Sequence, residues 1–277
     1  MTETNRIPIL YAGNAHVFDG MVISVLSVVK HHAGALEVYL FTMDLRDVDP
    51  SYQPISEAQR VYIEEILQAR NAESHAHLVD VGDFYRETLL RAANQDNQYT
   101  PYSFLRLYAD RVPSLPDKLI YLDTDTVLCN DIALLYQESL GDAEFAAVRD
   151  RYGSVFLGVN YLNSGVLLLN LPRIRETGLF RRAIDKCASK KIFLPDQTTI
   201  NRMAKKKKIL PRRFNEQKSI RRDTVVRHFS MTIRWLPVFR TQNIKPWQVE
   251  LVHDVLKVHD LDDILSDYLS RKPHFPA

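Results

Sequence analysis

Residues 119–131 read LIYLDTDTVLCND, and this stretch decides the fold. Four apolar residues lead directly into Asp123 and Asp125, and further apolar residues follow. A short apolar run bounded by polar residues is typical of a strand in the centre of a sheet. In open α/β sheets, ligands bind beyond the carboxyl ends of such strands. The stretch therefore predicts a central strand over 118–123 that ends at a ligand site.

Outward from this stretch, strand and helix patterns alternate through the first two thirds of the chain. The predicted strands are 7–12, 36–43, 75–81, 118–123, 143–150, 164–171 and 223–231. The predicted helices are 18–32, 56–70, 82–94, 102–112, 173–191, 195–206 and 248–277. Ser56 and Gln59 have the spacing of a capping box, which is a helix-start signal. The alternation predicts an α/β fold in one domain over 1–277, with a mostly parallel central sheet flanked by helices.

The composition is that of a globular protein of ordinary type. The chain has 277 residues, of which 45% are hydrophobic and 25% charged. No apolar stretch reaches the roughly 18 residues that span a bilayer, and the start, MTETNRIPILYAG, lacks the pattern of a signal peptide. Cys129 and Cys187 are far apart and form no CxxC pair. We therefore expect a cytoplasmic protein with reduced thiols.

Basic residues are concentrated in the C-terminal part. Residues 171–277 hold 24 Lys/Arg against 11 Asp/Glu, a net charge of +13, whereas residues 1–170 have a net charge of −11. The segment Lys205–Arg222 contains KKKK, RRF and RR. One interpretation is a solvated face; the other is peripheral contact with the anionic inner face of the membrane. Nucleic acid is not expected as a partner, because no pattern of stacking aromatic residues accompanies the run.

Asp123 and Asp125 are two residues apart, so an extended backbone turns both carboxylates to one side, about 7 Å apart. Two like charges at this separation repel, and a divalent cation such as Mn²⁺ or Mg²⁺ relieves the repulsion. The alternative without function is a capped turn. Two chemistries use such a strand end: metal-assisted sugar transfer from a nucleotide diphosphate, and phosphoryl transfer through an aspartyl nucleophile.

The second chemistry has its own support in the sequence. DTDTV resembles the signature of haloacid-dehalogenase phosphatases, and DDILSD (262–267) resembles the late acidic motif of that family. Those phosphatases usually carry the signature on their first strand. Here about 120 residues of predicted strands and helices come before it, which favours sugar transfer.

Several segments together resemble family 8 glycosyltransferases, in order and approximate spacing. They are IPILYAGNAH (7–16), YSFLRLYADRVPSLPDKLIYLDTDTVLCNDI (102–132), YLNSGVLLLNL (161–171), LPDQTTIN (194–201), VRHFS (226–230) and NIKPW (243–247). This resemblance implies a GT-A fold with a Rossmann-like sheet and a retaining, metal-dependent transferase of the bacterial lipopolysaccharide and surface-polysaccharide type, distantly related to glycogenin. It also implies a nucleotide-binding half over about 7–130, a donor-sugar and acceptor half over about 131–247, and a helical tail over about 248–277.

The resemblance assigns roles to individual residues. Asp123, Asp125 and His228 correspond to the metal ligands, and Lys245 to the lysine that contacts the diphosphate. The other residues of the implied UDP-sugar site are Tyr11, Ala12, Asn14, Arg106, Thr124, Asn163, Ser164, Asp196 and Gln197. Of these, Tyr11, Ala12 and Asn14 are expected near the base and ribose. Asn163, Asp196 and Gln197 are expected near the donor sugar.

The implied reaction moves glucose or galactose from UDP-glucose or UDP-galactose to a saccharide, glycoprotein or lipid-linked acceptor. Gln197 and Asp196 are the predicted catalytic residues. Retention has two routes, a covalent glycosyl carboxylate and a front-face path in which the acceptor proton passes to the departing phosphate. The sequence offers no pair of acids for the first route, so we expect the second. A degenerate module that binds a nucleotide sugar without turnover is the remaining alternative.

The chain departs from the family pattern at several positions. The late motif usually runs H-x-x-G-x-x-K-P-W, but here no glycine follows His228 at the third place and about eleven extra residues precede Lys245. Both assignments therefore require that the extra segment loops out and returns, as an acceptor wall or a lid. Asn14, His16 and Thr198 also differ from many relatives, which leaves the nucleotide and sugar preference open.

Overall fold

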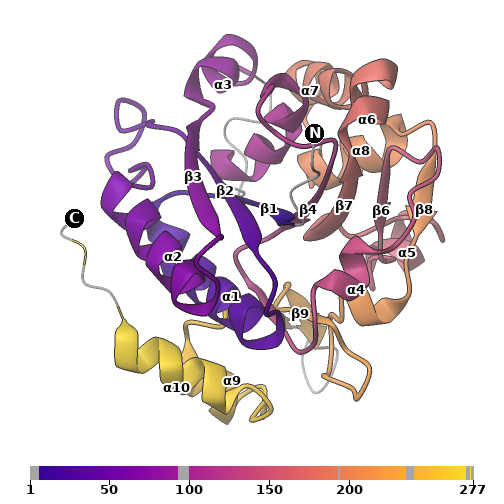
Figure 1. Cartoon of the computed structure of the whole chain (residues 1–277). Helices are drawn as coiled ribbons and strands as arrows, with labels where there is room; N and C mark the ends of the chain where they lie inside the picture. Colours follow the sequence, from indigo (N-terminus) through magenta and orange to yellow (C-terminus); the bar gives the residue numbers. More distant parts are fainter. Residues whose placement is uncertain (1–5, 93–99, 193, 235–239, 273–274, 276–277) are drawn as a thin grey trace.

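A seven-stranded sheet forms the centre of the molecule (Figure 1). The computed structural model describes residues 6–92, 100–192, 194–234, 240–272 and 275. The strand order is β3-β2-β1-β4-β7-β6-β8. These strands are β1 (Ile7–Ala12), β2 (Leu36–Thr42), β3 (His75–Asp80), β4 (Lys118–Leu122), β6 (Phe145–Ala147), β7 (Val166–Asn170) and β8 (Lys207–Ile209).

One strand of the sheet runs against its neighbours. β3, β2, β1 and β4 are parallel, β7 is antiparallel to both β4 and β6, and β8 is parallel to β6. The predicted α/β fold with a mostly parallel sheet is thus confirmed. Leu122 at the end of β4 pairs with Val166 at the start of β7. The residues just before β7 therefore lie beside the D-x-D segment that follows β4.

Helices cover both faces of the sheet. The α-helices are α1 (Phe18–His31), α2 (Glu57–Arg70), α3 (Gly82–Thr88), α4 (Ala133–Tyr136), α5 (Gly153–Phe156), α6 (Leu171–Thr177), α7 (Leu179–Ser189), α8 (Pro195–Met203), α9 (Val249–Asp254) and α10 (Asp262–Arg271). The 3₁₀ segments are η1 (Ala15–Val17), η2 (Pro101–Arg111) and η3 (Arg212–Phe214). Helices α1, α2 and α10 pack together, and η2 packs with α6, α7 and α8.

The alternation of side chains along β1 divides the core in two. Ile9 and Tyr11 belong to the cluster that includes the apolar face of α1, and Leu10 belongs to the cluster that includes η2 and α7. Both faces of a parallel strand are buried in this way, which is why β1 and β4 read as continuous apolar runs. α2 begins at the predicted capping box, with both reciprocal hydrogen bonds between Ser56 and Gln59 present.

Three helix predictions need correction. The helix predicted over 173–191 is two helices, α6 and α7, separated by Gly178 at φ 65°. The helix predicted over 82–94 ends at Thr88 as α3, whereas the helix predicted over 102–112 is present in 3₁₀ form. The C-terminal stretch 248–277 breaks between α9 and α10, where Lys257 has φ 56°. The breaks fall where the backbone adopts left-handed conformations that no α-helix contains.

Two short sheets complete the site edge. β5 (Thr126–Leu128) pairs with β9 (Val226–His228), with Thr126 opposite His228. The extra segment before Lys245 forms a hairpin of β10 (Thr232–Arg234) and β11 (Arg240–Gln242), so it does loop out and return. The strand predicted over 223–231 is shorter than expected because the chain turns after β9 into this hairpin. Residues 93–99, where the third predicted helix ended, and 235–239 lie outside the described residues.

Within the described ranges, none of the helices combines the length and the apolar character needed to traverse a bilayer. Neither Cys129 nor Cys187, both among the described residues, is in a disulfide.

Candidate functional site

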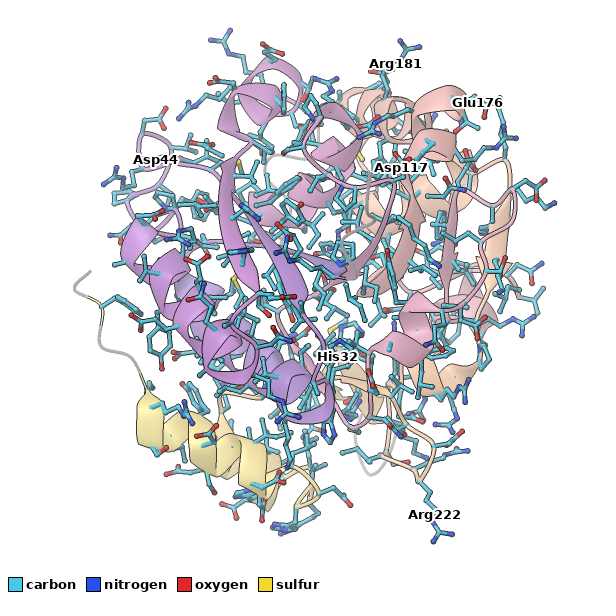
Figure 2. All side chains as sticks on the ribbon, in the orientation of Figure 1. His32, Asp44, Asp117, Glu176, Arg181 and Arg222 are labelled. Atoms are coloured by element: carbon cyan, nitrogen blue, oxygen red, sulfur yellow. The ribbon has the colours of Figure 1, made fainter. Side chains whose placement is uncertain are left out.

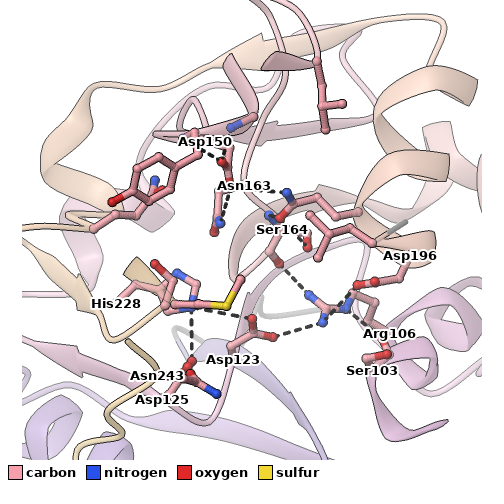
Figure 3. A pocket seen from close by; sticks show the side chains of 18 of the residues that line it. Ser103, Arg106, Asp123, Asp125, Asp150, Asn163, Ser164, Asp196, His228 and Asn243 are labelled. Atoms are coloured by element: carbon pink, nitrogen blue, oxygen red, sulfur yellow. Dashed lines mark hydrogen bonds and ion pairs between the residues drawn. The ribbon is translucent and has the colours of Figure 1, made fainter. Parts of the chain in front are cut away.

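A pocket of about 580 Å³ opens at the sheet edge where β4 ends and β7 begins (Figure 3). Asp123 and Asp125 enter it from the segment after β4, and His228 enters from the end of β9. The sequence predicted a ligand site beyond the carboxyl end of β4, and the pocket lies there. Because β5 pairs with β9, residues about 100 positions apart in the chain meet at this point.

The two aspartates and the histidine form a compact set of ligand atoms. Nε2 of His228 lies 3.1 Å from Oδ1 of Asp125 and 3.8 Å from Oδ2 of Asp123. One ligand atom from each residue lies within 4.8 Å of the other two. Two carboxylate oxygens and one imidazole nitrogen suit Mn²⁺ or Mg²⁺. The residues present therefore fit a divalent cation, and they are the three that the resemblance implied.

Gly165 leaves the space in which this cluster forms. A Cβ at this position would lie 2.2 Å from Cε1 of His228 and 2.8 Å from Oδ2 of Asp123. No side chain fits at these distances, so the backbone before β7 must be glycine there. The backbone just before β7 thus approaches the imidazole of His228 and the carboxylate of Asp123 closely.

Two cations neutralise the aspartates. Nζ of Lys245 lies 2.5 Å from Oδ2 of Asp125, and an Nη of Arg106 lies 3.1 Å from Oδ1 of Asp123. Burial by itself raises the pKa of Asp125, but Lys245 and His228 outweigh burial, and the pKa is well below its usual range. Asp125 is therefore a carboxylate at neutral pH, as a metal ligand must be.

Arg106 is buried and joins the D-x-D segment to the first turn of α8. The same Nη lies 3.3 Å from Asp196, another Nη donates to the carbonyl of Ser164 at 2.6 Å, and the guanidinium lies over the ring of Tyr121. Burial raises the pKa of Asp196, and Arg106 opposes the rise. A lone arginine in a helical pattern usually faces solvent, so only the resemblance pointed to this one.

Asp150 connects the predicted donor-sugar residues and was not predicted from the sequence. Its Oδ2 accepts hydrogen bonds from the amides of Asn163 at 2.9 Å and Gln197 at 3.2 Å. Its Oδ1 accepts from the backbone nitrogens of Tyr152 and Gly153. A signal for it existed, because Asp150 ends the predicted strand 143–150, and that strand reaches the same sheet edge as β4.

Four residues of the implied UDP-sugar site do not line this pocket. Among the described residues that line it, none is Tyr11, Ala12, Asn14 or Thr124. Ala12 and Asn14 are buried near the carboxyl end of β1, beside β4. Tyr11 has no exposed surface, and its hydroxyl bonds to Ser24 at 2.9 Å. Tyr11 thus offers no face to a base, and its expected packing against the nucleotide is corrected to a core role.

The phosphatase alternative gains no geometric support. The segment 262–267, which resembled the late acidic motif, lies in α10. None of its residues is among the described residues that line the pocket of Asp123. An aspartyl-nucleophile phosphatase needs both motifs at one site.

Known proteins similar to this chain include several glycosyltransferases. The lipopolysaccharide 1,2-glucosyltransferase of Escherichia coli (strain K12) is 25% identical over 281 residues, which cover 91% of this chain and 76% of that enzyme. Glycosyltransferase GlyA of Streptococcus pneumoniae is 25% identical over 202 residues, covering 72% of this chain. The chain spans 26% of the length of GlyA, and 14% of a Streptococcus gordonii protein named probable glycosyl transferase Gly.

Solved structures with the same fold include the galactosyltransferase LgtC in complex with donor and acceptor sugar analogues. It has a TM-score of 0.66 and 17% identity, over 97% of this chain and 98% of LgtC. The glycosyltransferase GlyE of Streptococcus pneumoniae has a TM-score of 0.63 and 19% identity, over 99% of this chain and 66% of GlyE. The GT-A fold expected from the sequence is thereby confirmed. The model of the family described as glycosyl transferase family 8 matches residues 8–249, and the chain therefore belongs to that family.

Proposed function

We propose that this chain transfers glucose or galactose from a UDP-sugar to a saccharide, glycoprotein or lipid-linked acceptor, with retention at the anomeric carbon and with Mn²⁺ or Mg²⁺ as cofactor. The observation that carries the proposal is the cluster of Asp123, Asp125 and His228 in the pocket, flanked by Arg106 and Lys245. A family-8 chain that had lost its chemistry would have no need for a buried, charge-balanced set of ligands.

Residues in and around this cluster stabilise the leaving group in different ways. When bound, a divalent cation supplies a Lewis acid for the charge that grows on the departing diphosphate. Lys245 is the second cation at the same point, and release from Asp125 frees its ammonium group to contact a phosphate oxygen. Arg106 holds Asp123 and Asp196 at fixed positions, close to each other in the pocket wall.

The donor-sugar side favours the front-face route. Gln197 is uncharged, and Asp196 is paired with Arg106. Asp150 is the further carboxylate of this wall, and it already accepts four hydrogen bonds, which weakens it as a nucleophile. We propose that Gln197 and Asp196 orient the donor sugar, while the acceptor hydroxyl loses its proton to the departing phosphate oxygen.

We also propose that the protein contacts a membrane, where a lipid-linked acceptor is located. A lipid-linked acceptor fits the basic segment Lys205–Arg222, with the protein on the cytoplasmic side and held peripherally at the inner face. Part of that segment is engaged within the fold, because Lys206 pairs with Asp142 and Lys208 with Glu138. Arg212 and Arg221 likewise pair with Glu216. The positive charge left for lipid includes Arg222, which points away from the body of the molecule in Figure 2.

Hydrolysis of UDP-glucose and UDP-galactose tests the proposal. We expect slow release of UDP that requires Mn²⁺ or Mg²⁺, stops with EDTA, and falls by about 10²–10³-fold in Asp125→Asn. Asp117→Asn is the matched control, because Asp117 flanks the opposite end of β4 with its side chain 81% exposed. Tight UDP binding without turnover of any UDP-sugar would instead identify a binding module. Metal-independent release would contradict the assigned cluster.

A further inference from the structure

An apolar loop projects from the rim of the pocket. Four of its five residues are large and exposed: Val155 (73%), Phe156 (64%), Leu157 (43%) and Val159 (68%). We call Val155–Val159, which runs from the end of α5 into the turn that follows it, the apolar loop. Only ten large hydrophobic residues in the described parts of the chain are exposed, so four in one loop form a concentration rather than scatter. Such concentrations mark interaction surfaces.

The base of the apolar loop is firmly held. Asp150 accepts hydrogen bonds from the backbone nitrogens of Tyr152 and Gly153 at the start of α5, and Nε of Arg149 donates to the carbonyl of Val159 at 3.0 Å. A Cβ on Gly153 would lie 2.3 Å from the ring of Tyr161, so the turn packs closely against the fold. The exposed apolar side chains are thus carried by a segment whose base is fixed to the fold.

The loop stands at the mouth of the pocket. Phe156 and Leu157 line the same pocket as Asp123, and so does Met231, which is 42% exposed on the opposite segment after β9. Whatever covers the apolar loop therefore lies next to the route by which an acceptor reaches the donor.

Positive charge surrounds the loop. Arg149 and Arg151 precede it and are exposed, and residues 151–160 contain no Asp or Glu. Asp150, between the two arginines, is engaged on the pocket side with the amides of Asn163 and Gln197. Gln217 joins this base to the basic segment, since its amide donates to the carbonyl of Arg149 and accepts from the nitrogen of Arg151. The exposed Lys218 follows directly. We call Arg149, Arg151 and Lys218 the basic collar. An apolar tip beside a basic collar is suited to an anionic bilayer surface, because the tip can contact the acyl chains while the collar contacts the phosphates.

We propose that the apolar loop inserts into the interface of an anionic bilayer while Arg149, Arg151 and Lys218 contact the headgroup phosphates. This arrangement sets the pocket mouth against the surface, where a saccharide on a lipid anchor is presented. The inference rests on the proposed function only for the nature of the acceptor. Attachment to the bilayer follows from the loop and the collar alone.

Vesicle co-sedimentation of the full chain tests the insertion directly. We expect binding to vesicles of phosphatidylcholine with 30% phosphatidylglycerol, weakened by salt, and little binding to phosphatidylcholine alone. Val155→Ser with Val159→Ser removes two exposed apolar side chains that do not line the pocket, and bound protein should fall by about tenfold. Val48→Ser with Leu269→Ser is the matched control, because both residues are exposed elsewhere, and its binding should equal that of the wild type.

The same variants separate this inference from the proposed function. Hydrolysis of UDP-sugar without vesicles should be unchanged in Val155→Ser with Val159→Ser. If the wild type binds vesicles but neither it nor any variant hydrolyses UDP-sugar, the proposed function fails and the insertion stands. Equal vesicle binding by wild type and loop variant would overturn the insertion. Loss of turnover on a soluble protein acceptor, without any vesicle binding by the wild type, would also overturn it and assign the loop to a protein.

Discussion

His228 and Asn215 are joined by a hydrogen bond of 3.2 Å between Nδ1 of the imidazole and Oδ1 of the amide. The amide nitrogen of Asn215 donates to Oδ1 of Asn163 at 2.8 Å, and the backbone nitrogen of Gly165 donates to the same oxygen. Asn163 therefore fixes which end of Asn215 faces the imidazole. The oxygen of Asn215 accepts, so Nδ1 of His228 donates to it, and Nε2, which faces Asp125, is the nitrogen that a bound cation would use.

Replacing Asn215 by leucine should weaken metal binding, because the imidazole loses the acceptor that sets its tautomer and orientation. Loss of such a partner typically costs 10–100-fold in metal affinity. Titration with Mn²⁺, followed by electron paramagnetic resonance, measures the metal affinity without any turnover. Asn215→Asp keeps an oxygen acceptor for Nδ1 and should retain more affinity than the leucine variant. Equal Mn²⁺ affinity in all three proteins would show that Asn215 does not orient His228.

Gly165→Ala should abolish the cluster while leaving the sheet intact. The added methyl group would meet the ring of His228 at 2.2 Å, so either the imidazole or the backbone before β7 must move. We expect loss of Mn²⁺ binding at millimolar metal, with a cooperative unfolding transition retained. A variant that binds Mn²⁺ like the wild type would contradict the close approach.

Asp110→Asn should stabilise the fold at neutral pH. Burial raises the pKa of Asp110 to about 6, and its Oδ1 has no hydrogen-bond partner among the described residues. A folded-state pKa above the unfolded value means that the contribution of the protonated group is present at low pH and is lost as pH rises through about 6. The gain from the substitution should therefore grow from pH 4 to pH 7, reaching about 1–3 kcal/mol.

Urea unfolding of wild type and Asp110→Asn at a series of pH values measures this gain. The pH-dependent part isolates the carboxyl group from any constant change in packing near Arg111 and Arg175, which are its charged neighbours. A difference in the free energy of unfolding that stays constant from pH 4 to pH 7 would contradict the raised pKa.

Gly178→Ala should destabilise the fold by about 1 kcal/mol, because the junction of α6 and α7 needs φ near 65°, where alanine is strained. Thermal unfolding measures the loss. Mn²⁺ affinity should stay that of the wild type, since the junction is remote from the metal cluster. An unchanged melting temperature would show that the helix break does not depend on glycine.

The sequence carried enough information for the centre of the fold. The apolar run before Asp123 and the capping box at Ser56 are local signals, and both predictions are confirmed. Gly178 was also a local signal, but the amphipathic pattern continued across it, and the break was missed. η2 has the apolar spacing of an α-helix, and nothing in its residues distinguishes the 3₁₀ form adopted there.

The site was less accessible from the sequence, because it is assembled across the sheet. His228 lies beside Asp125 only through the pairing of β5 with β9, which spans about 100 residues. Resemblance, not residue pattern, pointed to it. Asp150 follows a strand at the same sheet edge as Asp123, so it could have been predicted, but it was overlooked. Asn215 follows a 3₁₀ turn and has no feature in the sequence that marks it as a partner of His228.

The proposed function requires that Asp123, Asp125 and His228 together hold one divalent cation. Equilibrium Mn²⁺ titration in the presence of UDP, followed by electron paramagnetic resonance, tests it most directly. We predict one Mn²⁺ per chain, at least tenfold weaker binding in His228→Ala and in Asp125→Asn, and no change in Asp117→Asn. Binding by His228→Ala that equals the wild type, or no binding by the wild type, would contradict the claim.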